Sequence, residues 1–295
     1  MARLALICAV TVTLCVGLGA PVAVAADGTV AIRYLALGDS YAYGLGASDP
    51  ATRGYVSLFT ASLTASARTT VTAFNLADSG ATSGDLIGDY ATRGSQGTSQ
   101  LARAVQLLAT GGVNLVTLDI GGNDILHLLD RGQPCADTAL VSDTCLAAVQ
   151  GALRGETSAN IPRILTALVT AATPGTQIII LTYPNPYSVG TNSVVEQRTN
   201  AAVQGLNTII TGALTAAQPV AAMRGVTVTT VDLFPLFAGR SGRLTHYLDA
   251  ESDVHPTDAG YAVIAGAVTA AYRHATGADQ INAPDQPYFI SSLVG

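Results

Sequence analysis

A serine at the end of an apolar segment is the first residue that could carry out chemistry. Residues 32–37 are short and mostly apolar, which is typical of a β-strand covered by helices on both faces. Gly38 and Asp39 favour a turn, so Ser40 is expected where this strand gives way to a helix. In open α/β sheets, ligands bind at the edge that the carboxyl ends of the strands form. The sequence therefore predicts Ser40 as a nucleophile; the plainer alternative is a helix cap made by Asp39 and Ser40.

Further residues that suit acyl transfer are expected at the same edge. Gly80 follows a second predicted strand, Asn123 follows a third, and His255 follows the fifth. A serine hydroxyl is a weak nucleophile, so it needs a base such as His255 to accept its proton. Attack on an ester carbonyl places negative charge on oxygen. The backbone N–H groups of Ser40 and Gly80 and the side-chain amide of Asn123 could stabilise that charge.

The sequence lacks residue types and motifs on which several other reaction classes depend. The chain of 295 residues contains no lysine, which excludes a Ser–Lys dyad, a Schiff-base lysine and a Walker A lysine. The G-x-S-x-G of α/β-hydrolases and the H-E-x-x-H of zinc hydrolases are also missing. Gly44 and Gly46 begin a dinucleotide-binding pattern, but Asp49 takes the place of its third glycine. We therefore expect no cofactor and no catalytic metal.

Four short motifs along the chain resemble, in type and in order, those of the SGNH (GDSL) hydrolase family. They span most of the chain and are Gly-Asp-Ser at 38–40, Gly80 after Asn75, Gly121-x-Asn123-Asp124, and His255-Pro256 before a helix. The resemblance implies a flavodoxin-like, three-layer α/β/α fold and serine-dependent ester hydrolysis without a metal. It also implies Ser40 as nucleophile, His255 as base, and Gly80 and Asn123 as oxyanion donors with the Ser40 N–H.

The residue that orients His255 departs from the family pattern. The family usually has Asp three residues before the histidine, where this sequence has Ser252, and Asp253 lies only two residues before it. Either the Asp253 carboxylate or a backbone carbonyl near Ser252 could hold the imidazole. We expect Asp253 to assist, with a loss of roughly 10- to 100-fold when it becomes Asn, less than for a buried triad aspartate.

Apolar segments with strand character alternate with helical ones along the chain. Strands are predicted over 32–37, 71–77, 113–120, 177–182 and 226–231, and one of the intervening helices is expected to begin near Pro162. This alternation predicts an α/β fold with a parallel five-stranded sheet covered on both faces. We expect one catalytic domain over 27–295, irregular structure over 234–253, and make no assignment after 277.

The N-terminus and the cysteines point to export. Residues 1–26 combine a positive start, an apolar core and an A-x-A-like site, as a signal peptide does. Cys8 and Cys15 lie inside this segment and would leave with it. Cys135 and Cys145 remain, and two cysteines separated by a short loop in an exported protein are expected to form a disulfide. We therefore predict a secreted protein.

Composition limits the partners. The net charge is −6 and the arginines are scattered, which argues against binding to nucleic acid. Outside the first residues, no apolar run is long enough for stable membrane insertion. We expect a monomer that acts on a small-molecule or lipid ester as an esterase or lipase. The alternatives are a carbohydrate O-acetylesterase on the same scaffold and a non-catalytic, flavodoxin-like ligand-binding domain.

Overall fold

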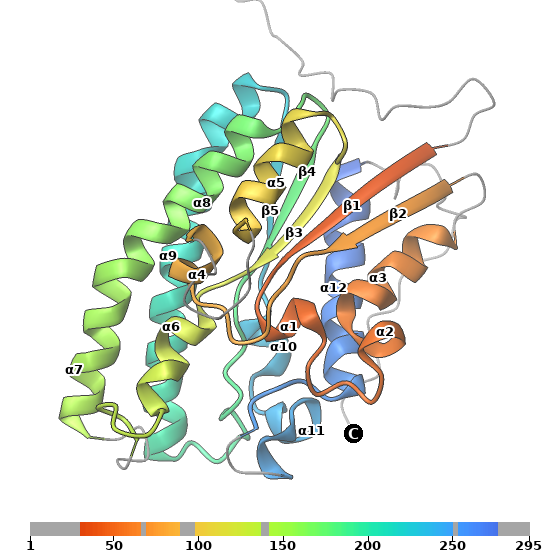
Figure 1. Ribbon diagram of the computed structural model, residues 1–295. Coiled ribbons are helices and arrows are strands. Elements are labelled where there is room, and N and C mark those ends of the chain that lie inside the picture. Colours follow the sequence, from red (N-terminus) through yellow and green to blue (C-terminus); the bar gives the residue numbers. More distant parts are fainter. Residues whose placement is uncertain (1–29, 66–68, 89–97, 137–141, 250–252, 277–295) are drawn as a thin grey trace, which may run out of the picture.

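The computed structural model describes residues 30–65, 69–88, 98–136, 142–249 and 253–276. The predicted signal peptide and the tail after 277 lie outside these residues. Within them, parallel strands form one five-stranded sheet in the order β2-β1-β3-β4-β5 (Figure 1). The strands are β1 (Val30–Gly38), β2 (Thr69–Asn75), β3 (Leu115–Asp119), β4 (Gln177–Leu181) and β5 (Thr227–Val231). The predicted α/β fold is confirmed.

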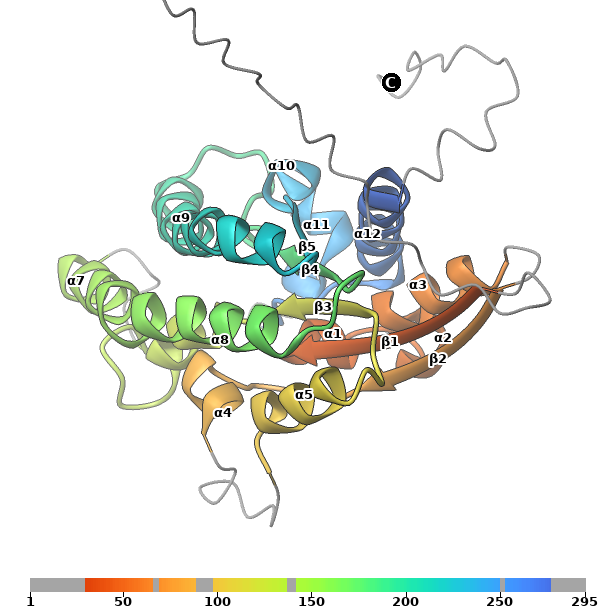
Figure 2. The ribbon, with the colours of Figure 1, turned by 90° about the horizontal axis from the view of Figure 1, so that it is seen from above.

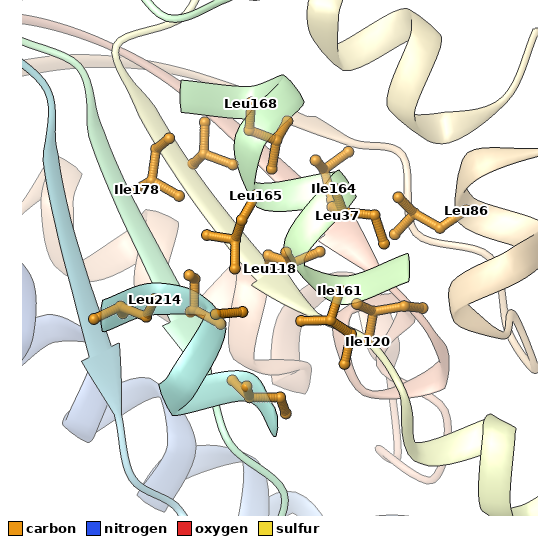
Figure 3. Close-up of a cluster of buried hydrophobic side chains, with 14 of the residues drawn as sticks. Leu37, Leu86, Leu118, Ile120, Ile161, Ile164, Leu165, Leu168, Ile178 and Leu214 are labelled. Atoms are coloured by element: carbon orange, nitrogen blue, oxygen red, sulfur yellow. The ribbon is translucent and has the colours of Figure 1, made fainter. Parts of the chain in front are cut away.

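Alternating side chains of the strands build a hydrophobic core on each face of the sheet. On one face, Leu35 and Leu37 of β1 pack with helices α5 (Gln100–Ala109), α8 (Ser158–Ala171) and α9 (Val194–Met223). Figure 3 shows part of this core. On the other face, Tyr34 and Ala36 pack with α3 (Tyr55–Thr64) and α12 (Asp258–Thr276). The two groups of helices lie on opposite sides of the sheet in Figure 2, which gives the three layers.

The remaining helices lie around the carboxyl ends of the strands and in the connections between the elements already named. They are α1 (Ser40–Tyr43), α2 (Pro50–Arg53), α4 (Ser83–Ile87), α6 (Gly122–Leu126), η2 (His127–Leu129), α7 (Asp143–Ala152), η3 (Leu153–Thr157), α10 (Phe234–Phe237), α11 (Ser241–Leu244) and η4 (His246–Leu248). The last three fall in the segment predicted to be irregular, where each is too short for helical periodicity to show in the sequence. None of the helices in the described ranges combines the length and the apolar character needed to cross a membrane.

Pro162 does not begin a helix, so that prediction was wrong. It lies inside α8, four residues after the helix starts at Ser158. The segment η3 joins α7 to α8, and Gly155 in η3 leaves the helical conformation and kinks the chain. Proline lacks the N–H that would bond to the carbonyl of the residue four positions earlier. Here that carbonyl belongs to Ser158, at the junction with the non-standard turn of η3, where the regular helical bonding has barely begun.

The order of the strands fixes where a site can form. The chain runs from β1 outward to β2, and then returns to place β3 on the other side of β1. The connections after β1 and after β3 therefore leave the sheet in opposite directions and open a crevice between them. The register pairs Gly38 with Asp119, so the two strands end at the same level. Segments after these two residues must meet at the crevice.

Candidate active site

The predicted nucleophile lies on the tight turn after β1. Ser40 is the first residue of α1, and Asp39 caps this short helix by accepting a hydrogen bond from the Tyr41 backbone N–H at 3.0 Å. The end of β1 is held by Gln100, whose side-chain amide accepts from the N–H of Gly38 and donates to its carbonyl, at 2.9 and 2.8 Å. Gln100 begins α5, and nothing in the sequence pattern marked it as a support of this turn.

The predicted base reaches the same place from the connection after β5. Nε2 of His255 lies 3.0 Å from Oγ of Ser40, across 215 positions of sequence. The segment that carries His255 is pinned by a bridge between Thr245 and Pro256 and by a bond from the His246 N–H to the His255 carbonyl. The structure therefore brings Ser40 and His255 into direct hydrogen-bonding contact.

Asp253 lies against the other nitrogen of the same imidazole. Its Oδ1 is 2.7 Å from Nδ1 of His255 and also accepts the His255 backbone N–H at 3.0 Å. Burial alone would raise the pKa of Asp253, but these hydrogen bonds outweigh it and lower the pKa below its usual value. An ionised carboxylate only accepts, so Nδ1 carries the proton and Nε2 is left to accept from the Ser40 hydroxyl. The alternative carbonyl near Ser252 lies outside the described residues.

The two predicted oxyanion donors line a cleft with Ser40 and His255. Gly80 has a φ of +80°, a left-handed conformation that favours glycine, in the connection after β2. Asn123 is buried on α6, and its Nδ2 donates to the carbonyl of Ala81 at 3.0 Å, which ties it to the Gly80 loop. A side-chain amide has a second N–H, so Asn123 keeps one donor beyond this bond.

Asp124 joins the loop after β3 to neighbouring helices. Its carboxylate accepts from the backbone N–H and the hydroxyl of Ser83 on α4, at 2.8 and 2.5 Å, and from the hydroxyl of Thr157 at 3.0 Å. Three donors on one carboxylate fix α6 against α4 and η3, and with it the position of Asn123. This role depends on contacts between distant segments, which the sequence does not reveal.

A narrow apolar pocket and a broad cleft both open beside Ser40. The pocket has a volume of about 80 Å³, and side chains of α6, α7 and α9 form its walls, among them Leu126, Val149 and Leu206. The cleft has a volume of about 1050 Å³ and a more polar lining that includes Ser79, His127 and Asp130. His127 thus lies along the cleft, whereas the imidazole bonded to Ser40 is that of His255.

The predicted disulfide lies in the wall of the apolar pocket. Cys135 and Cys145 are bonded to each other, and both are buried. The backbone N–H of Cys135 also donates to the carbonyl of Leu128 at 2.9 Å. Cys145 lines the apolar pocket and Cys135 lines the cleft. The bond therefore ties the segment after α6 to the start of α7, the helix that closes the pocket.

Two buried carboxyl groups, those of Asp39 and Asp119, lie close to Ser40 where β1 and β3 end. Burial raises the pKa of Asp39 to about 6, although hydrogen bonds from Tyr183 and from the Tyr41 backbone oppose the shift. Burial, together with the nearby Asp39, raises the pKa of Asp119 well above its usual range. Within the described residues, Oδ2 of Asp119 has no hydrogen-bond partner. The hydrogen bonds to the Asp39 carboxylate, at 2.5 and 3.0 Å, are shorter than the 3.4 Å contact from the Tyr55 hydroxyl to Asp119, so Asp39 is the carboxyl of the two that ionises first.

The sequence of this chain is similar to those of known lipases. Residues 36–263 match the GDSL-like lipase/acylhydrolase family. A lipase from Streptomyces rimosus is 30% identical over 200 residues, which cover 63% of this chain and 65% of the relative. This chain thus spans just under two thirds of that relative's length.

Solved structures show the same fold. The crystal structure of an extracellular lipase from Streptomyces rimosus has a TM-score of 0.54 at 25% identity, covering 81% of this chain and 99% of the other. A phospholipase A1 from Streptomyces albidoflavus has a TM-score of 0.55 at 22% identity, covering 81% and 98%. The fold, the motifs and the sequence match agree, and the chain belongs to the GDSL-like lipase/acylhydrolase family, as the resemblance predicted.

Proposed function

We propose that the protein is a secreted serine hydrolase that cleaves carboxylic esters, of the esterase or lipase type, through an acyl-enzyme intermediate. The observation that carries this proposal is the line of contacts from Asp253 Oδ1 to His255 Nδ1, at 2.7 Å, and from His255 Nε2 to Ser40 Oγ, at 3.0 Å. A carboxylate, an imidazole and a hydroxyl in this order form the arrangement that activates a serine. Membership of a lipase/acylhydrolase family supports the same reaction.

The reaction would proceed in two halves. In the first, the Ser40 oxygen attacks the ester carbonyl while His255 takes the hydroxyl proton and then delivers it to the departing alcohol. The backbone N–H groups of Ser40 and Gly80 and the amide of Asn123 would stabilise the negative carbonyl oxygen. In the second half, His255 takes a proton from water, which attacks the acyl group on Ser40. The acid leaves and Ser40 regains its proton.

The two cavities beside Ser40 divide the substrate between them. Most of the side chains that line the narrow pocket are apolar, and it leads from Ser40 toward Val149 and Leu206. Its volume of about 80 Å³ suits an acyl group a few carbons long. The broad, more polar cleft suits the alcohol. An acetyl group would leave the pocket beyond Ser40 unused. This pocket favours esters whose acyl group is a few carbons longer than acetyl.

Secretion and a monomeric state complete the proposal. Residues 1–26 would act as the signal peptide, and the Cys135–Cys145 disulfide supports an oxidising destination. A relative of similar fold is an extracellular lipase. One chain supplies Ser40, His255, Asp253 and the walls of both cavities, so a single copy has what the reaction needs.

The second candidate is a carbohydrate O-acetylesterase. It is favoured by the size of the cleft, which is wide enough for a sugar and carries polar groups such as Ser79 and Asp130. In that case the acyl group would be acetyl, and the apolar pocket would play no part in selecting substrates.

A series of p-nitrophenyl esters from acetate to laurate, run beside an acetylated oligosaccharide, distinguishes the candidates. We expect kcat/KM to be higher for esters with acyl groups a few carbons longer than acetyl than for the acetate. The variant Ala202→Phe fills the apolar pocket from α9 and should remove the advantage of longer chains while sparing acetate. Ala201→Phe is the control, because its side chain is exposed on the same helix. Preference for the acetylated sugar would favour the second candidate, and a lack of any hydrolysis would favour the ligand-binding domain.

A further inference from the structure

A tyrosine outside the sequence motifs contacts the turn that carries the nucleophile. The hydroxyl of Tyr183, two residues beyond β4, donates to Oδ2 of Asp39 at 2.5 Å, and Tyr183 is buried. The other oxygen of the same carboxylate, Oδ1, accepts the N–H of Tyr41 at the start of α1. One carboxylate therefore connects Tyr183 to the helix on which Ser40 is the first residue.

The ring of Tyr183 also packs on the turn that carries Asn123. A Cβ atom added to Gly122 would lie only 2.7 Å from a ring carbon of Tyr183, so the phenol lies directly against this backbone. The ring is also in contact with that of Tyr41, with centroids 5.7 Å apart. Tyr183 thus touches the connection after β1 and the connection after β3, the two sides of the crevice.

Tyr183 is itself held from the long helix α9. The side-chain amide of Asn207 accepts from the Tyr183 N–H and donates to its carbonyl, both at 2.8 Å, and Asn207 is buried. Pro184 follows and restricts the backbone of Tyr183 to extended conformations. The tyrosine therefore has little freedom, and its hydroxyl is presented to Asp39 from a fixed position.

We propose that Tyr183 is a positioning residue for the ester-hydrolase reaction: its hydroxyl holds the Asp39 carboxylate at the start of α1 while its ring supports Gly122, so that Ser40 and Asn123 keep their relative positions. The inference rests on the proposed function of Ser40 and Asn123 and adds a residue that acts through Asp39. A shift of about 1 Å between a nucleophile and an oxyanion donor is enough to lower turnover by roughly 100-fold.

The state of the Asp39 carboxyl gives this role a signature in pH. Burial raises the pKa of Asp39 to about 6, and the hydrogen bond from Tyr183 acts against that rise. Without the hydroxyl, the pKa of Asp39 moves higher, and more of the carboxyl is neutral near pH 6 to 7. The titratable groups around it are the carboxyls of the buried Asp119 and of Asp124, and the phenols of Tyr41, Tyr55, Tyr183 and Tyr261. As pH rises toward 9, more of the Asp39 carboxyl ionises in both enzymes, so the two should differ less.

The variant Tyr183→Phe tests the proposal, because it keeps the ring against Gly122 and removes only the hydroxyl. We expect kcat to fall about 10- to 100-fold for p-nitrophenyl acetate and for longer esters alike, with KM changed little. The ratio of wild-type to variant kcat should be larger at pH 6.5 than at pH 9. Tyr34→Phe is the matched control, because it also removes a buried hydroxyl, one bonded to Thr117 at 2.7 Å, and kcat should stay near the wild-type value.

A double-mutant cycle with Asp39→Asn decides whether Tyr183 acts through that carboxyl. On the Asp39→Asn background, Tyr183→Phe should lower kcat by less than about threefold, since the carboxylate it holds is already gone. Equal effects on both backgrounds, or a change only in KM for long chains, would overturn the inference and leave Tyr183 as a wall of the pocket. If the wild type itself hydrolysed no ester, the proposed function would fail. This outcome differs from the two results that would overturn only the role of Tyr183.

Discussion

Oδ1 of Asp253 accepts two hydrogen bonds from His255, one from the backbone N–H at 3.0 Å and one from ring Nδ1 at 2.7 Å. The backbone bond closes an Asx turn, in which an aspartate accepts from the N–H two residues later. This turn bends the chain so that a carboxylate only two positions away reaches the ring of its neighbour. The shorter spacing therefore yields the same contact as the three-residue spacing that the family usually has.

Replacing Asp253 by Asn should lower kcat by about 100- to 1,000-fold, which is less than the loss of roughly 10,000-fold for a buried triad aspartate. The amide can still accept the backbone bond, but it does not stabilise the imidazolium that forms during attack. The loss is smaller because the Asp253 side chain is 37% exposed, so water screens its charge. Because Asp253 contacts Nδ1 of His255, we expect a larger loss of kcat than the roughly 10- to 100-fold predicted from the sequence alone.

Steady-state turnover of Asp253→Asn, compared with His255→Ala, measures this effect. Asp249→Asn is the control, because its carboxylate pairs with His246 and not with His255. A loss below about 10-fold would show that another group, such as a backbone carbonyl, orients the imidazole.

Asn123→Ala should lower kcat by roughly 100-fold or more, since it removes one donor to the developing oxyanion. The melting temperature serves as a check on folding, because the variant also loses the bond to the Ala81 carbonyl. Asn160→Ala provides a comparison, since that amide donates to Ser83 nearby and not into the cleft. A rise in KM with kcat unchanged would instead make Asn123 a residue that binds the ground state.

Much of the site follows from the pattern of strands. Ser40, Gly80 and Asn123 each follow a strand, and parallel strands must bring such residues to one edge, so their convergence could be predicted without a structure. The order of β1 and β3 then places Ser40 and Asn123 on the two sides of one crevice. The family resemblance added the expected role of each residue.

The supports of the site could not be predicted in the same way. Tyr183, Gln100 and Asp124 act through hydrogen bonds to segments far away in sequence. No periodicity or motif marks Tyr183 or Gln100, and the motif that contains Asp124 does not show what its carboxylate holds. The prediction that a helix begins near Pro162 was wrong, because the residues around Pro162 form a helix despite the preference of proline for the first turn. Local pattern therefore predicts which residues reach the edge, whereas packing decides what holds them there.

Stability should depend on pH through His246. Its Nε2 faces the Gly46 carbonyl at 2.8 Å and its Nδ1 faces Asp249 at 3.1 Å, so only the protonated ring donates to both acceptors. The bond to Gly46, and then Asp249 and Asp253, raise the pKa of His246 against the opposing effect of burial. A raised pKa stabilises the fold below the unfolded value of about 6.5, and this contribution is lost as pH rises through the folded value.

The variant His246→Gln should therefore melt below the wild type by a larger margin at pH 5.5 than at pH 9. Thermal melts of both proteins across this range supply the measurement. A margin that stayed constant, or that grew toward pH 9, would mean that protonation of His246 does not stabilise the fold.

The Cys135–Cys145 disulfide should stabilise the fold and shape the apolar pocket. It closes a separation of 10 residues, for which the chain-entropy estimate is about 2–3 kcal/mol. The double variant Cys135→Ser/Cys145→Ser should melt at a lower temperature. It should also lose more activity on butyrate than on acetate, because α7, which forms part of the pocket wall, is no longer bonded to the segment that carries Cys135. Mass spectrometry of the secreted wild type showing two free thiols would refute the bond.

The central claim is that Ser40 forms the covalent acyl-enzyme. The most direct measurement is reaction of the purified protein with a fluorophosphonate probe, followed by peptide mapping of the adduct by mass spectrometry. The account predicts one adduct, on Ser40, and neither adduct nor ester turnover in Ser40→Ala, with the melting temperature of that variant close to the wild type. An adduct on another residue, or ester turnover retained by Ser40→Ala, would contradict it.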